Sequence, residues 1–252
     1  LVPAALVGVD LDRLLDRGAA MAEACREPEA ARNPGARLGA IMGALARAGR
    51  DKLTIVASPA VEGLVDWVEQ LVAESTGKEG VGILPVVREP PGPPEVYGPD
   101  RLFVALQLGE DDPHEAALAA LEAAGNPVVR LQMVDRYDLG RQYMLWEFAT
   151  AVAGHILGIN PFDQPDVEAA KIAAREAVAA YTETGRRPEA EAVPPTVGAL
   201  RSFLAMARPG DYVALQAFVQ PTAETTAALQ ALRQRIRDAY RLATTVGFGP
   251  RF

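Results

Sequence analysis

The chain of 252 residues is 49% hydrophobic and 23% charged, which is an ordinary globular composition with ample material for a core. A formal net charge of −8 argues against nucleic acid or an anionic membrane surface as a partner. Cys25 is the single cysteine, so an internal disulfide is excluded and a reducing, cytoplasmic setting is favoured. The sequence contains no apolar run long enough to span a membrane, and we expect no signal peptide.

The first half of the chain predicts an alternation of helices and strands. Two alanine-rich helices are expected over 8–26 and 35–48, with a turn at Asn33-Pro34 between them. A strand over 51–57 and a helix that begins near Pro59 follow, because Val61, Leu64, Val65, Val68 and Val72 recur at helical spacing.

The middle of the chain predicts a sheet with parallel strands. Strands are expected over 82–87, 101–108 and 127–134, with a helix over 113–124 between the last two. This β-α-β order predicts a doubly wound sheet, in which ligands bind beyond the carboxyl ends of the strands. Residues 89–99 hold five prolines and two glycines, so we expect a loop that borders the site.

The last part of the chain is expected to be mostly helical. A helix over 139–157 is apolar on most sides and should be buried, with Glu147 and His155 as its polar exceptions. We interpret His155 as a hydrogen-bonded core histidine and His114 as an exposed residue of a first helical turn. A helix over 165–184, a linker, a helix over 196–207, a strand over 211–219 and a closing helix over 223–243 complete the prediction.

A polar run, QLVAESTGKEG, ends the helix that begins near Pro59 and occupies residues 70–80. Gln70 and Glu74 are four residues apart and therefore lie on one side of this helix. Glu74 stands near the helix C-terminus, where the macrodipole disfavours an acid, and such local conflicts are typical of functional residues. The alternative is that Glu74 and Lys78, also four apart, form only a surface ion pair.

A second polar run, FDQPDVEAAK, covers residues 162–171. Pro165 suits the first turn of a helix, and Gln164 and Lys171 then lie two turns apart on one side. The alternative for Lys171 is an ion pair with Glu168 on the same helix. The chain has only three lysines against twenty-two arginines, and two of these lysines fall within the two runs.

Together the two runs resemble the phosphoglucose isomerase (glucose-6-phosphate isomerase) family. That family shows a Q-L-x-x-E-S-x-G-K helix end and a signature F-D-Q-x-x-V-E-x-x-K, and both occur here at matching spacing, although Asp166 stands where glycine or alanine is usual. The wording of 69–80, 82–86 and 146–154 looks like the bacterial branch in which the isomerase is fused behind a transaldolase.

The resemblance implies a reaction and a set of residues. The fold would be a three-layer αβα sugar-isomerase (SIS) domain with a mainly parallel sheet and extra helices at both ends. Glu74 would move a proton between C1 and C2 through an enediol, and Lys171 would contact the sugar oxygens and assist ring opening. Gln70, Gln164 and Gly77 would bind the substrate, a sugar phosphate. The reaction needs neither a cofactor nor a metal, and the histidines and the cysteine show no zinc-ligand spacing.

The resemblance also implies missing parts. The family's Ser/Thr-rich phosphate loop and its G-R-[FY]-S segment have no match in residues 1–252. We therefore expect a fragment. Residues 1–50 would lead in from an absent sugar-isomerase domain, 51–185 would be the second such domain, and 186–252 would be a truncated helix-strand-helix extension. Upstream isomerase and transaldolase domains would be partners, a homo-oligomer stays open, and the alternative function is a non-catalytic sugar-phosphate-binding domain.

Overall fold

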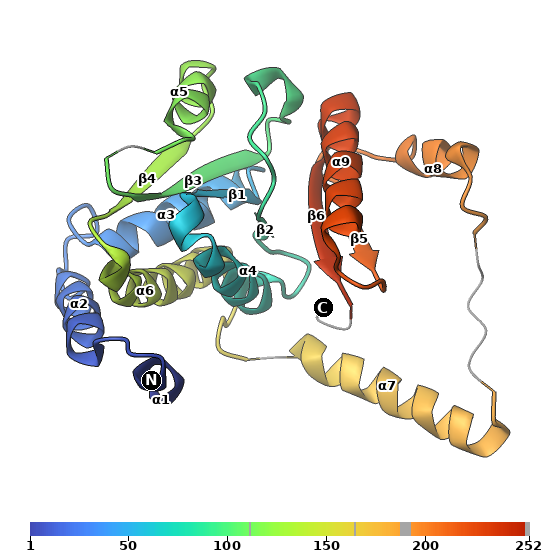
Figure 1. Ribbon diagram of the computed structural model, residues 1–252, viewed down its shortest axis with the longest axis horizontal. Coiled ribbons are helices and arrows are strands. Elements are labelled where there is room, and N and C mark those ends of the chain that lie inside the picture. The colour runs from blue at the N-terminus through green and yellow to red at the C-terminus, as the bar shows by residue number, and fades with distance from the viewer. Residues whose placement is uncertain (111, 164, 187–192, 250–252) are drawn as a thin grey trace. The chain divides into compact units, whose positions relative to one another are not determined.

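The computed structural model describes residues 1–110, 112–163, 165–186 and 193–249, with the backbone alone for 165–167 (Figure 1). The described chain divides into two compact units. Unit 1 comprises Leu1–Pro161 and Tyr212–Phe252, and unit 2 comprises Phe162–Asp211. Each unit is considered by itself.

The chain begins with helices in unit 1: α1 (Val2–Leu6), α2 (Leu11–Ala24) and α3 (Pro34–Arg47). The side chain of Asp10 accepts a hydrogen bond from the Arg13 amide at the start of α2, and Asn33 accepts one from the Ala36 amide at the start of α3. The turn expected at Asn33-Pro34 is thus the beginning of α3. The two predicted helices are confirmed, and α1 was not foreseen.

A parallel four-stranded sheet in the order β2-β1-β3-β4 forms the centre of unit 1. Its strands are β1 (Lys52–Ala57), β2 (Leu84–Val86), β3 (Arg101–Leu108) and β4 (Val128–Met133). The short helix η1 (Pro59–Val61) and α4 (Gly63–Thr76) connect β1 to β2, and α5 (Glu115–Ala123) connects β3 to β4. The chain therefore has the α/β fold with a parallel sheet that its sequence predicts.

The two faces of the sheet carry different layers. Leu53, Ile55 and Val104 on one face pack in a single core with α3, α4 and α6 (Leu139–Leu157). Ala105 and Phe103 point to the other face, where they meet Leu118 and Leu121 of α5. Consecutive side chains of a strand point to opposite faces of the sheet. Because both sets are hydrophobic here, both faces must be covered by helices. These are the three layers of the fold.

Helix α6 is buried against α2 and α3 through glycines. A β-carbon at Gly39 of α3 would lie 2.7 Å from the Cβ of Val152, and one at Gly18 of α2 would lie 3.3 Å from the Gly140 oxygen. The predicted bounds of α6 are those observed. The prediction for His155 was wrong, because this side chain is exposed and the buried polar positions of α6 are Gln142 and Thr150.

The end of the chain returns to unit 1 as β5 (Tyr212–Ala217), α9 (Ala223–Tyr240) and β6 (Ala243–Phe248). Strands β5 and β6 pair in parallel. The predicted closing helix over 223–243 was wrong at its end, since α9 stops at Tyr240 and Arg241 adopts a left-handed conformation with φ 57°. The β-branched residues Thr244, Thr245 and Val246 then favour a strand.

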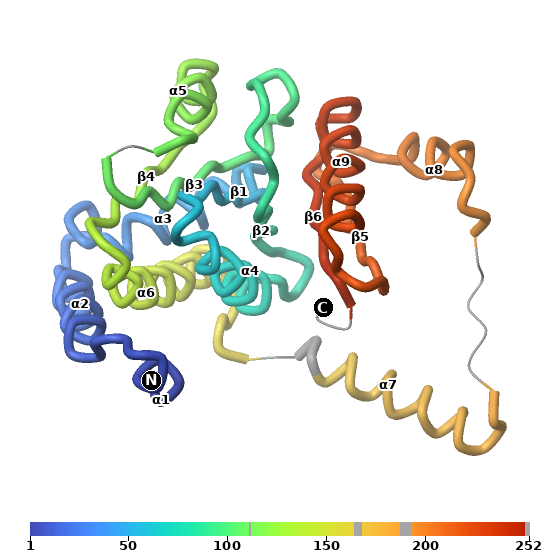
Figure 2. Tube along the Cα trace, in the orientation of Figure 1, coloured from blue at the N-terminus to red at the C-terminus, as the bar shows by residue number. Residues whose placement is uncertain are grey.

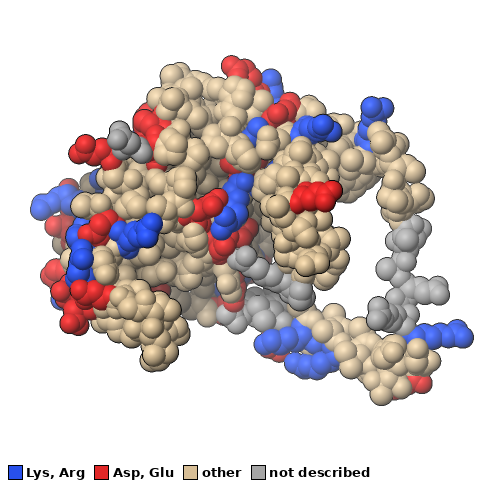
Figure 3. Space-filling view, in the orientation of Figure 1, with Lys and Arg blue, Asp and Glu red and all other residues tan. Residues whose placement is uncertain are grey.

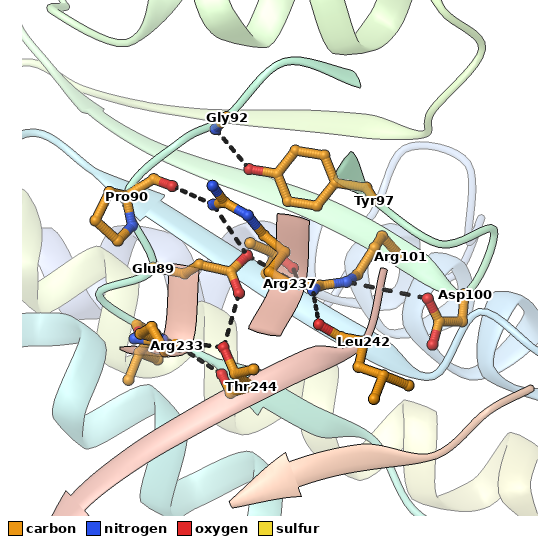
Figure 4. A network of polar contacts seen from close by, with 12 residues as sticks. Glu89, Pro90, Gly92, Tyr97, Asp100, Arg101, Arg233, Arg237, Leu242 and Thr244 are labelled. Carbon is orange, nitrogen blue, oxygen red and sulfur yellow. Dashed lines mark hydrogen bonds and ion pairs between the residues drawn. The ribbon is translucent and has the colours of Figure 1, made fainter. Parts of the chain in front are cut away.

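A buried polar network attaches this last segment to the sheet (Figure 4). Glu89 of the proline-rich segment accepts hydrogen bonds from Arg101 of β3 at 3.2 Å and from Thr244 of β6 at 3.2 Å. Arg233 of α9 donates to the Val87 oxygen at 2.9 Å, and Arg237 donates to the Pro90 oxygen at 2.6 Å. Burial lowers the pKa of the Arg233 guanidinium to about 10. The proline-rich segment, which includes the short helix η2 (Pro94–Val96), is therefore fixed by charge pairs.

Unit 2 contains α7 (Pro165–Thr184) and α8 (Val197–Leu204). The hydroxyl of Thr196 caps α8 by accepting from the Ala199 amide at 3.1 Å. Both helices were predicted, α7 with its observed bounds and α8 with an end three residues too late.

Candidate active site

The first polar run ends α4, as the sequence predicts. Glu74 lies on the last turn of this helix and is partly exposed, and Gln70, one turn earlier, is exposed. Gly77 is the residue at which the helix stops, where a β-carbon would lie 2.9 Å from the Ala73 oxygen. A β-carbon at Gly82 would lie 3.1 Å from the Gly77 α-carbon, so the backbone at Gly82 packs closely against the backbone at Gly77. Three of the predicted site residues thus share one helix end.

The segment after the helix is held in a tight hairpin. Lys78 and Val81 exchange two backbone hydrogen bonds of 3.0 and 2.9 Å, and the turn between them has φ 54° at Glu79 and 79° at Gly80. Positive φ at both central residues is the geometry of a two-residue β-turn, in which glycine is preferred. The buried Thr76 hydroxyl donates to the Val72 oxygen at 2.7 Å and accepts from the Ile83 amide at 3.0 Å. The helix end is therefore rigidly connected to β2.

Lys78 is buried, with 4% of its surface exposed. Its ammonium donates a hydrogen bond of 2.9 Å to the backbone oxygen of Asn160, 82 residues further along the chain. The interpretation of Lys78 as a surface residue that only pairs with Glu74 was therefore wrong about its exposure. The contact brings the end of the first polar run against the residues that immediately precede the second.

The loop that contains Asn160 is fixed by α6, which Figure 2 shows leading directly into it. Gly158 ends α6 in a left-handed conformation with φ 81°, and the Ile159 amide donates to the Gly154 oxygen at 3.1 Å. Pro161 packs on Gly154, where a β-carbon would lie 3.0 Å from the proline ring. The Asn160 oxygen thus has a defined place at the end of this part of unit 1.

The residues of the second polar run lie in unit 2. Gln164 is outside the described residues. Lys171 is an exposed residue of α7, and its ammonium lies 2.8 Å from a carboxylate oxygen of Glu168. This is the ion pair that the sequence offered as the alternative. An exposed pair on one helix contributes only about 0.3–0.5 kcal/mol, so the ammonium can leave it for a ligand at little cost.

The described residues offer neither a metal-binding cluster nor a membrane-spanning helix. It contains no group of three or more His, Cys, Asp or Glu residues that could hold a metal ion. No helix among the described residues has the length and apolar character to cross a membrane. His114, expected to be exposed, is half-buried at the start of α5, and its amide donates to Asp112.

Acidic and basic side chains are interspersed on the face of unit 1 drawn in Figure 3. Ion pairs of unit 1 include Arg13 with Asp135 at 3.0 Å and Arg130 with Glu122 at 2.9 Å. Charges of both signs side by side do not make the one-sign surface that attracts a polyanion.

Two solved structures resemble the chain in their fold. The crystal structure of a hypothetical protein from Thermus thermophilus matches 70% of the chain with a TM-score of 0.59 and 24% identity, over 52% of that protein. A glucose-6-phosphate isomerase from Chlamydia trachomatis matches 77% of the chain with a TM-score of 0.51 and 16% identity, over 46% of its length. At these identities the likeness shows the fold alone, an αβα arrangement with a parallel sheet.

Sequence relatives are more specific. The glucose-6-phosphate isomerase of Symbiobacterium thermophilum is 33% identical over 209 residues, which are 68% of this chain and 47% of the relative. The enzyme of the same name from Rubrobacter xylanophilus is 34% identical over 213 residues, 68% of this chain and 49% of the relative. No family model matches the sequence. The chain is a homologue of glucose-6-phosphate isomerases over about two thirds of its length, and it spans about half the length of the curated relatives it matches.

Sequence reasoning did not foresee the contact between Lys78 and Asn160. Asn160 contributes a backbone oxygen, which no side-chain pattern reveals. The scarcity of lysine draws attention to Lys78 in the sequence, but it does not reveal what the ammonium contacts.

Proposed function

We propose that the chain is the part of a glucose-6-phosphate isomerase that carries the catalytic base, and that it takes part in the interconversion of glucose 6-phosphate and fructose 6-phosphate. Sequence similarity to isomerases over two thirds of the chain supports the reaction class. The observation that carries the proposal is the hydrogen bond from Lys78 to Asn160, because it joins the helix end with Glu74 to a residue that stands two positions before the second polar run in the sequence.

In this proposal Glu74 removes the proton from C2 of the open-chain aldose and returns it to C1 of the enediol, which gives the ketose. A carboxylate can serve both carbons because they are neighbours, and its place on the last turn of a helix fixes its reach. Lys171 would hold the sugar oxygens, exchanging its pair with Glu168 for them. Gln70 would bind the substrate from the same face of α4 as Glu74, Gln164 from the second run, and Gly77 at the helix end.

We also propose that the remaining parts of the site come from outside these 252 residues. Isomerase relatives are about twice as long as the part that matches here. The Ser/Thr-rich phosphate loop and the arginine of the G-R-[FY]-S segment would lie in an upstream sugar-isomerase domain. A transaldolase would precede that domain, and the whole enzyme would be cytoplasmic. Binding energy from the remote phosphate orients the reacting carbons, so the chain alone should turn over very slowly.

Turnover of glucose 6-phosphate to fructose 6-phosphate tests the proposal. The chain alone should be nearly inactive, and the chain mixed with the proposed upstream domain should be active. Glu74→Gln should abolish that activity, whereas Glu62→Gln, on an exposed acid of the same connection, should not. Binding of the sugar phosphate without turnover in the folded mixture would instead favour a non-catalytic sugar-phosphate-binding domain.

A further inference from the structure

Lys78 is a buried cation with an acceptor far away in sequence. With 4% of its surface exposed, its ammonium donates to the Asn160 oxygen at 2.9 Å. Removing an ammonium from water is costly unless hydrogen bonds compensate, so a methionine or leucine would fill the same space more cheaply. The cation is therefore suited to a task beyond packing.

On one side Lys78 is fixed to the helix that carries Glu74. Its amide and its carbonyl are both bound to Val81, and Thr76 fastens the preceding turn to Val72. Glu74 lies one helical turn before these contacts. A displacement of the Lys78 backbone is thus a displacement of the last turn of α4.

On the other side Lys78 holds the place where the chain leaves the first part of unit 1. That part ends at Pro161, one residue after the acceptor, and the second polar run begins at Phe162. Pro161 is packed on Gly154 of α6, so the acceptor oxygen is held by the core as well as by the ammonium.

We propose that Lys78 is a positioning residue of the isomerase, which fixes the departure point of the second polar run relative to Glu74. This role rests on the proposed function. Lysine suits it because an ammonium is compact and can donate to one buried carbonyl, whereas a planar guanidinium presents a wider fork of donors. Displacement by about 1 Å of groups that orient a substrate costs on the order of 100-fold in rate.

The variants Lys78→Met and Lys78→Arg test this role, with Lys52→Met as the matched control. Lys52, the first residue of β1, is also a buried lysine, with 2% of its surface exposed. Its ammonium pairs with the adjacent Asp51 at 2.7 Å. Amide hydrogen exchange of the folded chain is the first readout. Lys78→Met should accelerate amide exchange at Ile159 and in the hairpin 78–81. This acceleration over the wild type should be at least ten times that caused by Lys52→Met. Equal exchange in the two variants would overturn the role.

Isomerase kinetics in the active mixture are the second readout. Lys78→Met should lower kcat about 10- to 100-fold and change KM by less than about threefold. Lys78→Arg, which keeps a donor, should restore part of kcat, and Lys52→Met should keep wild-type kcat per folded molecule. If the wild type is active and Lys78→Met retains its kcat, only the role of Lys78 is wrong. If the wild type is inactive while Glu74 is intact, the proposed function is wrong, and the positioning role with it.

Discussion

Glu89 and Arg101 form an ion pair of 3.2 Å in which neither side chain has any exposed surface. Arg237, 3% exposed, lies 4.0 Å from the same carboxylate and pairs with Asp238 at 2.8 Å. Arg233, 1% exposed, donates to the Thr244 hydroxyl, which in turn donates to Glu89. The buried acid of the proline-rich segment is thus paired directly with Arg101 of β3, whereas the two arginines of α9 have weaker or indirect contacts with it. The carboxylate attaches β6 through Thr244, and hydrogen bonds from Arg233 and Arg237 to backbone oxygens attach α9.

Replacement of Glu89 by glutamine should destabilise the chain by about 3–5 kcal/mol, because it removes the carboxylate of a fully buried ion pair with Arg101. Urea unfolding measures this. Glu122→Gln, which removes the exposed partner of Arg130, should cost less than about 1 kcal/mol. Similar losses for the two variants would show that burial of the Glu89 network adds nothing.

Replacement of Gly39 by alanine should destabilise the chain by about 1–3 kcal/mol, because the added carbon meets α6 at Val152 and at the Ala149 oxygen. Gly63 is the matched control, since it lies in α4 with open space around its α-carbon. Gly63→Ala should stabilise by up to about 1 kcal/mol through helix propensity. Thermal unfolding distinguishes the two, and a neutral Gly39→Ala would contradict the close packing of α3 on α6.

Burial raises the pKa of the Cys25 thiol above its ordinary value of 9.0. The folded state then holds this proton more tightly than the unfolded state, so the stabilisation is complete below pH 9.0 and is lost as the pH rises above it. The wild type should therefore lose stability relative to Cys25→Ala as the pH rises from 9.0 to about 11. A difference between the two proteins that stays constant over this range would contradict the raised pKa.

The sequence predicts most of the fold because hydrophobic periodicity and β-α-β order are local signals. Helix α6 and strand β3 have their predicted bounds for this reason. Strand β6 was missed because Ala223–Ala243 reads as one helical run, in which no glycine or proline marks the stop at the left-handed Arg241. His155 was misplaced because periodicity on a helix that is apolar on most sides does not reveal which side faces the solvent.

The site was predictable only in part. Glu74, Gln70 and Gly77 follow one another on a single helix end, which sequence spacing describes well. The contact between Lys78 and Asn160 joins residues 82 apart through a backbone atom, so neither spacing nor residue type could predict it. The roles of all five site residues, Glu74, Gln70, Gly77, Lys171 and Gln164, stay predictions.

The most direct test of the account is exchange of the C2 proton of glucose 6-phosphate with solvent deuterium, followed by NMR. Proton transfer by Glu74 through an enediol predicts that deuterium enters C2 when the chain is mixed with the proposed upstream domain. It also predicts that Glu74→Gln stops this exchange while the fold is kept, and that Glu62→Gln does not. Exchange that persists in Glu74→Gln at the wild-type rate would contradict the assignment of Glu74 as the base.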